Sequence, residues 1–393
     1  YLLANDRIQH EYVKAYTNAS FLVRPDFKFE DGLFTGYDAE KRSYDKTTWA
    51  YELDKDGFAK TDPSLQDARC VYQLMKAHFA RYTPEVVESV TGVPRAQFLK
   101  ICEIVASTAA PSRVMTSLYA LGWTQHTTGS QMIRTMAMIQ LLLGNMGMPG
   151  GGMNALRGHS NIQGLTDLGV MSHLLPGYLT LPTEADPDLK TYLEKRTLKP
   201  LRPGQLNYWS NYPKFFVSLM KSWYGPAATK ENDFGYAWLP KLDPGMAPSW
   251  LVLFDNMSRG KYKGFFAWGQ NPACSGSNAG KVRKALGNLE WMVAVNLFDN
   301  ETASFWKGPG VDPAKVNTEV FFLPAAASFE KEGSVTNSGR WAQWRTAAVR
   351  PLGQSRPDTE ILNDLFFRIK ALYAKEGGAF PDPLVNLTWN YGF

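Results

Sequence analysis

Apolar residues recur at helical spacing through the early part of the chain, where one short β-rich stretch interrupts them. This pattern predicts a helix over Leu2 to Tyr16 and further helices between Ser64 and Ser107. The β-rich stretch, Arg113 to Leu121, leads through a loop into a helix expected over Gly129 to Leu143. A strand, a loop at its carboxyl end and a following helix are typical of α/β folds.

A second α/β pattern lies in the later part of the chain, after an irregular stretch at about 176–243 that is rich in Pro, Tyr and Trp. That stretch shows helical periodicity only near Tyr212 to Trp223. Helical segments then alternate with three apolar runs of strand length, Gly264 to Trp268, Trp291 to Val295 and Glu319 to Leu323. The spacing predicts parallel strands joined by right-handed crossovers.

The two patterns together predict an α/β protein with two lobes and mainly parallel sheets. We expect the first lobe over residues 1–158, the second over 159–360, and a helix with a linker over 361–393. A length of 393 residues is enough for two or three domains. The chain begins at Tyr1 without a methionine or a signal peptide, so we expect an internal piece of a longer protein.

Composition narrows the class of protein. With 44% hydrophobic and 20% charged residues the chain is typical of globular proteins, and no segment approaches the ~20 apolar residues of a membrane span. The net charge of +5 is spread without a basic stripe, which argues against nucleic acid and leaves ordinary surface charge or an anionic ligand. The three cysteines are widely separated, so they match neither a disulfide framework nor an iron–sulfur or zinc site.

An unusually polar turn follows the helix that is expected to end at Leu143. Gly144 to Gly152 is dense in glycine, and Met153 to Gly169 then gathers an arginine, a histidine and several side-chain amides. Glycines let the backbone approach a bulky ligand, while amides and an arginine can bind carbonyl, carboxylate or phosphate oxygens. A solvated surface turn has a similar composition, so composition alone leaves both interpretations open.

Polar residues also follow each of the strands expected in the second lobe. Gly269, Gln270 and Asn271 follow the first strand, Asn296 follows the second, and Lys331 lies in the loop after the third. The carboxyl ends of parallel strands meet at one edge of a sheet, where ligands bind in open α/β folds. The three loops therefore predict a nucleotide site, although Asn271 and Asn296 taken singly suit turn-forming roles.

Several long motifs, in a fixed order, resemble one protein family. The segments LYALGWTQHTTG (Leu118 to Gly129), LLLGNMGMPGGG (Leu141 to Gly152) and LRGHSNIQG (Leu156 to Gly164) resemble the large subunits of molybdopterin-dependent oxidoreductases. Continued through Gly169, the third segment is similar to formate dehydrogenases, above all to the major subunits of the respiratory, membrane-associated type. Further matches are Tyr208 to Ser222, Glu301 to Trp306 and Gly333 to Trp344.

The resemblance implies a bis-molybdopterin guanine dinucleotide with molybdenum or tungsten as the cofactor. It suggests that Asn271, Asn296, Lys331 and Asp358 contact the guanosine-bearing end of one dinucleotide, in the crevice that Gly269 and Gln270 share. Relatives often have an aspartate at the position of Asn296, so this contact departs from the family pattern. An asparagine offers donors as well as acceptors, but no charge.

The first lobe resembles the part of the family that approaches the second dinucleotide. The resemblance assigns this contact to Leu121, Gly122, Gln125 and His126. His126 suits equally well the role of a structural donor that holds the loop.

The resemblance also gives Arg157 the role of binding formate. A guanidinium fork matches a planar carboxylate in a way that a lysine cannot. The alternative is that Arg157 pairs with a pterin phosphate or an acidic neighbour. His159, Asn161 and Gln163 are expected either to line the same pocket or to brace the loop, and Asp167 is expected to cap the segment that follows.

The reaction implied is oxidation of formate to carbon dioxide, with the electrons leaving through iron–sulfur clusters. Two parts of the family pattern have no counterpart in this sequence: the amino-terminal cysteines that hold a 4Fe–4S cluster, and the selenocysteine or cysteine that precedes a histidine. We therefore expect this piece to be inactive by itself. The resemblance also implies that both α/β lobes are incomplete here, because each lobe of the family includes strands from earlier sequence. The implied partners are an iron–sulfur beta subunit and a membrane cytochrome b gamma subunit, and the implied location is the periplasm.

Two other interpretations stay open at this point. The chain could come from a nitrate or arsenic-compound oxidoreductase of the same superfamily, against which Arg157 argues because periplasmic nitrate reductases lack an arginine there. It could also be a non-catalytic nucleotide-binding or assembly module that keeps the fold without turnover. A Cys-His or selenocysteine-His pair elsewhere in the parent protein would favour the enzyme.

Overall fold

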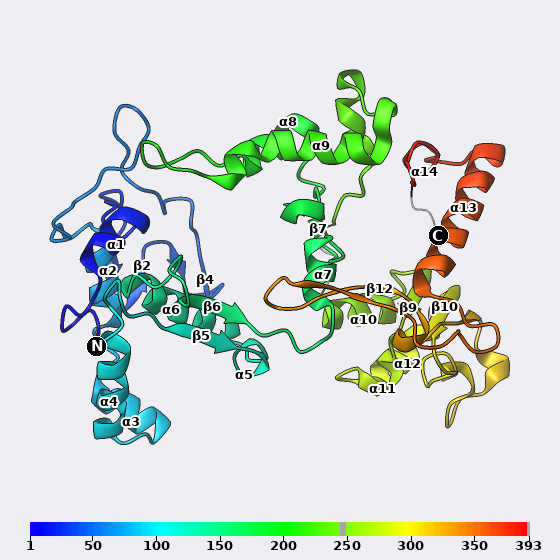
Figure 1. Ribbon diagram of the computed structural model, residues 1–393, viewed down its shortest axis with the longest axis horizontal. Coiled ribbons are helices and arrows are strands. Elements are labelled where there is room, and N and C mark those ends of the chain that lie inside the picture. The colour runs from blue at the N-terminus through cyan, green and yellow to red at the C-terminus, as the bar shows by residue number, and fades with distance from the viewer. Residues whose placement is uncertain (244–248, 391–393) are drawn as a thin grey trace. The chain divides into compact units, whose positions relative to one another are not determined.

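The computed structural model describes residues 1–243 and 249–390. The chain forms two compact units (Figure 1), one made of Tyr1–Gly158 with Lys199–Asn207 and the other of His159–Leu198 with Tyr208–Phe393. Each unit has hydrophobic clusters of its own. In the described part of the chain, none of the helices has the length and hydropathy that crossing a membrane requires.

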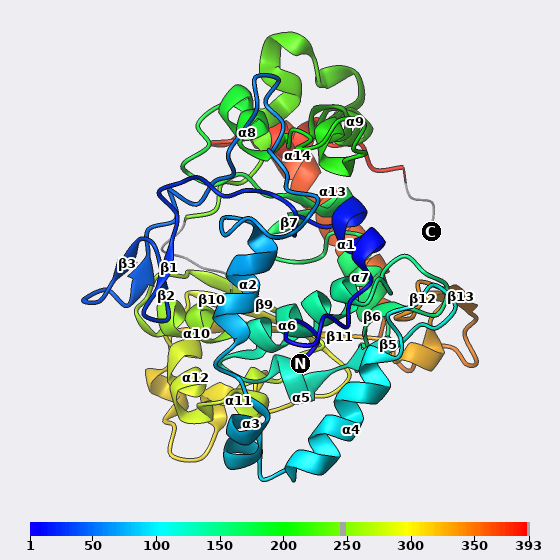
Figure 2. The same ribbon diagram turned by 90° about the vertical axis from the view of Figure 1, so that its left-hand side faces the viewer.

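The first unit consists of helices, two small hairpins and a pair of parallel strands (Figure 2). Its helices are α1 (His10–Tyr16), α2 (Val71–Phe79), α3 (Pro84–Thr91), α4 (Arg95–Ala106), α5 (Leu121–Thr124) and α6 (Gly129–Leu142). Its strands are β1 (Phe29–Glu30), β2 (Leu33–Phe34), β3 (Tyr37–Asp38), β4 (Ser43–Tyr44), β5 (Thr116–Tyr119) and β6 (Gly152–Ala155).

The strands β5 and β6 form a parallel pair joined through α6. The sequence predicted β5 and α6, but it placed the residues of β6 in the polar turn rather than in a strand. Thr116 pairs with Gly152 and Tyr119 with Ala155. The end of α6 is buried in the core of the unit, where Leu143 contacts a cluster that includes Val13 of α1. The loop expected before α6 contains the single helical turn of α5.

The first helix is shorter than the predicted Leu2 to Tyr16. The backbone of Asp6 is left-handed, with φ at 50°, which interrupts any helix that begins earlier. The Gln9 side chain then accepts a hydrogen bond of 2.7 Å from the Tyr12 N–H, which caps α1 so that it begins at His10. The helices expected between Ser64 and Ser107 are confirmed as α2, α3 and α4.

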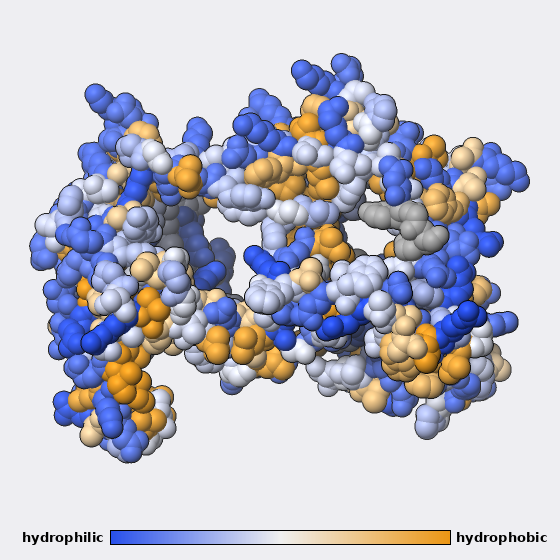
Figure 3. Space-filling view, viewed as in Figure 1, coloured by the Kyte–Doolittle hydropathy of each residue, from blue (hydrophilic) through white to orange (hydrophobic). Residues whose placement is uncertain are grey.

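The helices α3 and α4 leave hydrophobic side chains exposed. Val90 is 78% exposed, and Ile101 and Ile104 of α4 are more than half exposed. Figure 3 shows hydrophobic residues gathered over these two helices. The helical spacing of apolar residues therefore predicted the helices correctly, but not the burial of this face.

The second unit contains the larger parallel sheet. Its helices are α7 (Ile162–Asp167), α8 (Leu189–Arg196), α9 (Tyr212–Tyr224), α10 (Trp250–Ser258), α11 (Pro272–Ser275), α12 (Ala279–Leu286), α13 (Asp358–Glu376) and α14 (Asp382–Val385). Its strands are β7 (Leu174–Leu175), β8 (Leu179–Thr180), β9 (Gly264–Trp268), β10 (Trp291–Asn296), β11 (Glu319–Pro324), β12 (Gly333–Thr336) and β13 (Ala342–Arg345). Its 3₁₀ turns are η1 (Pro176–Tyr178), η2 (Tyr208–Asn211), η3 (Gly225–Ala227), η4 (Lys230–Trp238), η6 (Phe305–Lys307), η7 (Pro313–Lys315) and η8 (Ser328–Glu330).

The sheet has the order β11-β10-β9, and all three strands are parallel, which confirms the predicted α/β class. On one face, Met292 and Ala294 pack into a core with residues of α10 and α12. On the other face, Val295 packs with Ile361 of α13. Both faces of the central strand are covered in this way, as is normal in parallel sheets, which is why β10 is apolar from Trp291 to Val295.

The stretch at 176–243 is more ordered than its irregular pattern predicted. Tyr192 of α8, together with Phe216 and Met220 of α9, has no exposed surface, and Tyr236 packs against them. This core is built largely from aromatic rings; the Tyr192 and Phe216 ring centroids are 5.2 Å apart. Tyrosines that bury a ring while their hydroxyl groups find polar partners weaken the apolar periodicity on which the prediction depended.

Candidate functional site

The carboxyl ends of β9, β10 and β11 lie at one edge of the sheet. Gly269 and Gln270 directly follow β9, and both are exposed. Asn296 is the last residue of β10, paired with Pro324 at the end of β11. The loops that the sequence predicted to share a crevice therefore begin at the same edge.

The two asparagines at this edge already use their amides within the protein. Asn271 donates a 2.6 Å hydrogen bond to the Glu301 carboxylate and accepts one of 2.9 Å from the Thr302 hydroxyl. Asn296 donates to the Gln270 carbonyl at 3.1 Å and accepts from the next backbone N–H. In this structure both side chains shape the loops, and their contact with a dinucleotide stays a prediction.

A cation and an anion are paired near this edge. The Lys331 ammonium group donates a hydrogen bond to the carboxylate of Asp358, the first residue of α13. The segment that leads to α13 runs beside the end of β11, because the Ala326 N–H donates to the Arg356 carbonyl at 2.8 Å. Since the Lys331 and Asp358 side chains are 31% and 37% exposed, solvent or a ligand can still reach the pair.

In the first unit, two polar segments follow the parallel strands β5 and β6. Leu121, Gly122, Gln125 and His126 are all exposed at and just after α5, which follows β5 directly. Arg157 is exposed and stands two residues after β6. Because β5 and β6 are parallel and paired in register, these two segments leave the pair at the same edge.

The residues after Arg157 are placed around α7, in the second unit. His159 is exposed, and its Nδ1 lies 2.9 Å from the Ser160 carbonyl oxygen. The Asn161 side-chain oxygen accepts a 3.0 Å hydrogen bond from the Thr336 N–H of β12. Gln163 is buried and donates to Asp167 at 2.8 Å. The bracing role is therefore the one that the structure supports for Asn161 and Gln163.

Asp167 was expected to cap the following segment, and this prediction was wrong. Asp167 is the last residue of α7 and accepts hydrogen bonds from Gln163 and from the Tyr178 hydroxyl. The Arg340 guanidinium lies 3.5 Å from the same carboxylate. No pattern in the sequence predicted a role for Tyr178 or Arg340. Only the motif match over Gly333 to Trp344 includes the position of Arg340.

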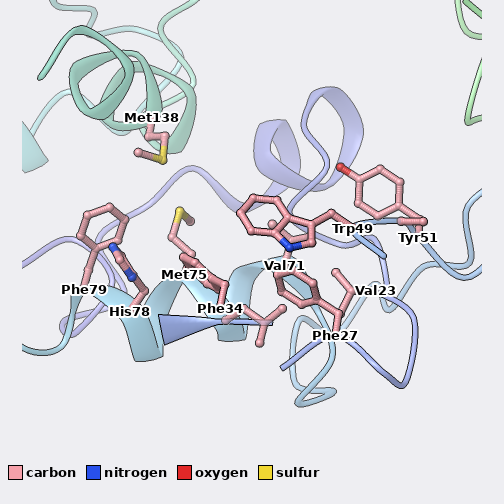
Figure 4. Close-up of a pocket in the computed structure, with 12 residues that line it drawn as sticks. Val23, Phe27, Phe34, Trp49, Tyr51, Val71, Met75, His78, Phe79 and Met138 are labelled. Atoms are coloured by element: carbon pink, nitrogen blue, oxygen red, sulfur yellow. The ribbon is translucent and has the colours of Figure 1, made fainter. Parts of the chain in front are cut away.

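A further cavity is lined by none of these residues. It belongs to the first unit, has a volume of about 520 Å³, and is lined mostly by aromatic and aliphatic side chains (Figure 4). Trp49, Met75, Phe79 and His78 face this space. Burial lowers the pKa of His78 from its ordinary value. Among the residues that the structure describes, no three His, Cys, Asp or Glu side chains gather as a metal site would require.

Comparisons with known proteins identify the family. Residues 8–368 match the family described as Molybdopterin oxidoreductase. The whole chain is 56% identical to the nitrate-inducible formate dehydrogenase major subunit and 55% identical to the formate dehydrogenase-O major subunit, both of Escherichia coli (strain K12), and covers 39% of each. It is 48% identical to the formate dehydrogenase subunit alpha of Megalodesulfovibrio gigas, of which it covers 38%.

The chain thus spans about 39% of the length of the two Escherichia coli relatives. The family match covers far more than half of the present sequence and includes β5, β6 and the parallel sheet β9 to β11. The chain belongs to the molybdopterin oxidoreductase family.

Proposed function

We propose that the chain is the central part of a formate dehydrogenase major subunit and that the complete subunit oxidises formate to carbon dioxide. Five relatives that match the whole chain at 47% to 56% identity carry the name formate dehydrogenase. The observation that carries the proposal is the placement of Arg157. It lies exposed, just after β6, within a motif that resembles formate dehydrogenases.

Arg157 would bind the formate carboxylate. Its guanidinium presents parallel N–H groups that match the two oxygens of a planar carboxylate. Binding in that geometry fixes the direction in which the formate C–H bond points, which is the bond that breaks. The oxidation releases carbon dioxide, one proton and two electrons.

A bis-molybdopterin guanine dinucleotide is the cofactor that the proposal requires, with molybdenum or tungsten as its metal. The donor groups at the edge of the three-stranded sheet fit the guanosine-bearing end. Lys331 offers a cation to a phosphate, Asp358 offers a carboxylate to guanine donors, and Gly269, with φ at 59° and nothing within 4 Å of an added Cβ, leaves room for close approach. When bound, the cofactor supplies the two-electron acceptor.

The segment at β5 is the proposed contact with the second dinucleotide. Gln125 and His126 offer polar side chains there, and the exposed backbone at Leu121 and Gly122 leaves space beside them. His159 is exposed and is proposed to lie at the substrate pocket, whereas Asn161 and Gln163 support the loop.

The remaining parts of the electron path are proposed from likeness to the relatives. We infer a 4Fe–4S cluster held by another part of the major subunit, a selenocysteine or cysteine ligand to the metal, and transfer through an iron–sulfur beta subunit to a membrane cytochrome b gamma subunit. We infer that the complete subunit serves electron transport in anaerobic respiration and that it is periplasmic. The present sequence supplies neither the cluster cysteines nor a Cys-His pair.

Substrate preference in the full-length complex tests the proposal. Purified complex, with its metal and pterin content quantified, is given formate and an oxidising dye, or a reduced dye with nitrate or an oxidised arsenic compound. Rapid dye reduction with formate alone is expected. Turnover of nitrate or the arsenic compound without formate oxidation would favour a nitrate or arsenic-compound oxidoreductase of the same superfamily. A cofactor-free protein that is inert with every substrate would favour a non-catalytic module.

Replacing Lys331 by Met is expected to lower dinucleotide retention. The change removes a charge-assisted contact to a phosphate, so affinity should fall by roughly tenfold or more. The measurement is the guanine nucleotide and pterin released per full-length subunit after extensive dialysis. Lys263→Met is the matched control, because Lys263 directly precedes β9, at the opposite edge of the same sheet, where it pairs with Glu290 at 3.1 Å. Equal retention in wild type and both variants would exclude Lys331 as a cofactor contact.

A further inference from the structure

Four side chains from three segments meet at the end of α7. The Tyr178 hydroxyl donates to the Asp167 carboxylate and lies 3.3 Å from Nε2 of Gln163. Arg340 donates to the same hydroxyl at 3.0 Å. One phenol oxygen thus connects α7, the turn η1 and the tip of the β12–β13 hairpin. Its hydrogen bond to the carboxylate, together with burial, raises the pKa of Tyr178, so the hydroxyl stays protonated.

Arg340 contributes both charge and ring contact to this cluster. Its guanidinium lies 3.5 Å from an Asp167 oxygen and 5.9 Å from the centre of the Tyr178 ring. Although the Arg340 side chain is 62% exposed, Gln163 beneath the cluster is buried. The arginine therefore lies at the exposed side of the cluster and Gln163 at its buried side.

The backbone conformations show that this arrangement is held against local preference. Tyr178 and Arg340 both have φ at 62°, in the left-handed region that residues other than Gly, Asn and Asp rarely adopt. Such conformations persist where the surrounding contacts determine them, and they cluster at sites that need a fixed geometry. Here two residues in this conformation are joined by one hydrogen bond, from the Arg340 guanidinium to the Tyr178 hydroxyl.

The other end of α7 is fixed by the same hairpin. Asn161, at the N-cap, accepts the hydrogen bond from Thr336 of β12. Gly164 makes this approach possible, because a Cβ added there would lie 2.2 Å from the Asn161 side-chain oxygen and 3.3 Å from the Thr336 Cβ. The β12–β13 hairpin therefore holds α7 at its first residues through Thr336 and at its last residue through Arg340.

We propose that Arg340 is a positioning residue for substrate binding: through Tyr178 and Asp167 it locks α7, and so fixes the end of the preceding segment, which carries Arg157 and His159. The kinetic part of this inference rests on the proposed function. A helix of one to two turns is not stable by itself, so its orientation depends on contacts at its ends. Release of one end lets the preceding segment sample other conformations.

The test replaces Arg340 by Met in the full-length complex. Amide hydrogen exchange of residues 162–168 should accelerate by about tenfold or more. KM for formate should rise by roughly tenfold, with kcat changed much less, because the segment is mispositioned in the free enzyme and recovers once substrate is bound. Arg340→Lys, which keeps a cation, should restore part of the loss.

Arg345→Met is the matched control on the same hairpin, because the Arg345 guanidinium donates at 2.8 Å to Gln343 on its own strand, β13. It should change neither exchange at α7 nor KM. Combining Arg340→Met with Tyr178→Phe should raise KM no further than the stronger single variant, since both act through one hydroxyl.

Unchanged hydrogen exchange at α7 in Arg340→Met would overturn the inference. So would a double variant whose rise in KM equals the product of the rises in Arg340→Met and Tyr178→Phe. Amides of β9 to β11 report global stability, and acceleration there equal to that at α7 would also overturn it. If the wild-type complex does not oxidise formate, the proposed function fails, whereas the exchange experiment still decides whether Arg340 locks α7.

Discussion

Arg157→Lys in the full-length complex is expected to lower kcat/KM for formate by about 10- to 100-fold, because it removes one arm of a charge-assisted contact. Lysine keeps the positive charge but cannot present two parallel N–H groups to one carboxylate. Metal and pterin content should be the same in variant and wild type, since the substitution leaves charge and backbone unchanged. The measurement is formate-dependent dye reduction, normalised to the bound metal.

Arg113→Lys provides the matched control for that variant. Arg113 is also exposed and also adjoins the parallel pair of the first unit, but it precedes β5, at the amino end of the strand. Its kcat/KM should equal that of the wild type. If Arg157→Lys keeps full activity, Arg157 has a structural role. If it loses its cofactor instead, Arg157 binds a pterin phosphate, which was the alternative from the sequence.

Asp186→Ala should destabilise the aromatic core of α8 and α9 by about 3 kcal/mol, because it leaves a mostly buried arginine without its partner. The Asp186 carboxylate is 1% exposed and accepts a 2.8 Å hydrogen bond from Arg196, whose side chain is 18% exposed. Lys195 donates to the second oxygen at 3.0 Å and is 48% exposed, so its share is smaller. The measurement is the free energy of local opening from hydrogen exchange of the α9 amides.

The stabilisation of the folded state by Asp186 should decrease as pH falls. Its pKa lies well below the ordinary 3.8, first because Arg196 donates to it, and also because Thr183 and Lys195 do. A carboxyl whose pKa is lowered by folding stabilises the folded state above its ordinary pKa, and this stabilisation is lost as pH falls. The difference between wild type and Asp186→Ala should therefore be full at pH 7 and shrink below about pH 4.

Glu194→Ala is the control for Asp186, since Glu194 lies on α8, the helix that carries Arg196, is 66% exposed and pairs with Lys190 at 3.9 Å. An exposed pair of this kind contributes about 0.5 kcal/mol or less. Equal destabilisation by the two alanine variants would contradict the importance assigned to burial of the Asp186 pair. A difference that stays constant down to pH 3 would contradict the role of its charge.

The parallel strands were predictable because their pattern is local. Gly264 to Trp268 matches β9, and β10 and β11 each extend one residue beyond the prediction. A strand buried on both faces is apolar throughout, so a short apolar run between turn residues identifies it. The sheet edge that gathers Gly269, Asn296 and the loop of Lys331 followed from this parallel order alone.

The contacts within the candidate site were not predictable, because they join residues far apart in the chain. Arg340 and Tyr178 meet across 162 positions. Nothing in the sequence near Asp167 distinguishes a carboxylate that caps a segment from one that receives a distant arginine. Likewise, the position of Asn296 after a strand suggested a ligand contact, whereas its amide bonds the Gln270 carbonyl. Side-chain partners depend on tertiary packing, which periodicity does not encode.

Product formation from labelled formate tests the central claim most directly. The full-length wild-type complex is given ¹³C-formate and a limiting amount of oxidising dye, and the ¹³C-labelled carbon dioxide is quantified by mass spectrometry. If the chain is part of a formate dehydrogenase, one labelled carbon dioxide should appear for every two electrons that the dye accepts. A cofactor-loaded complex that reduces the dye from other donors but releases no labelled carbon dioxide would contradict the claim.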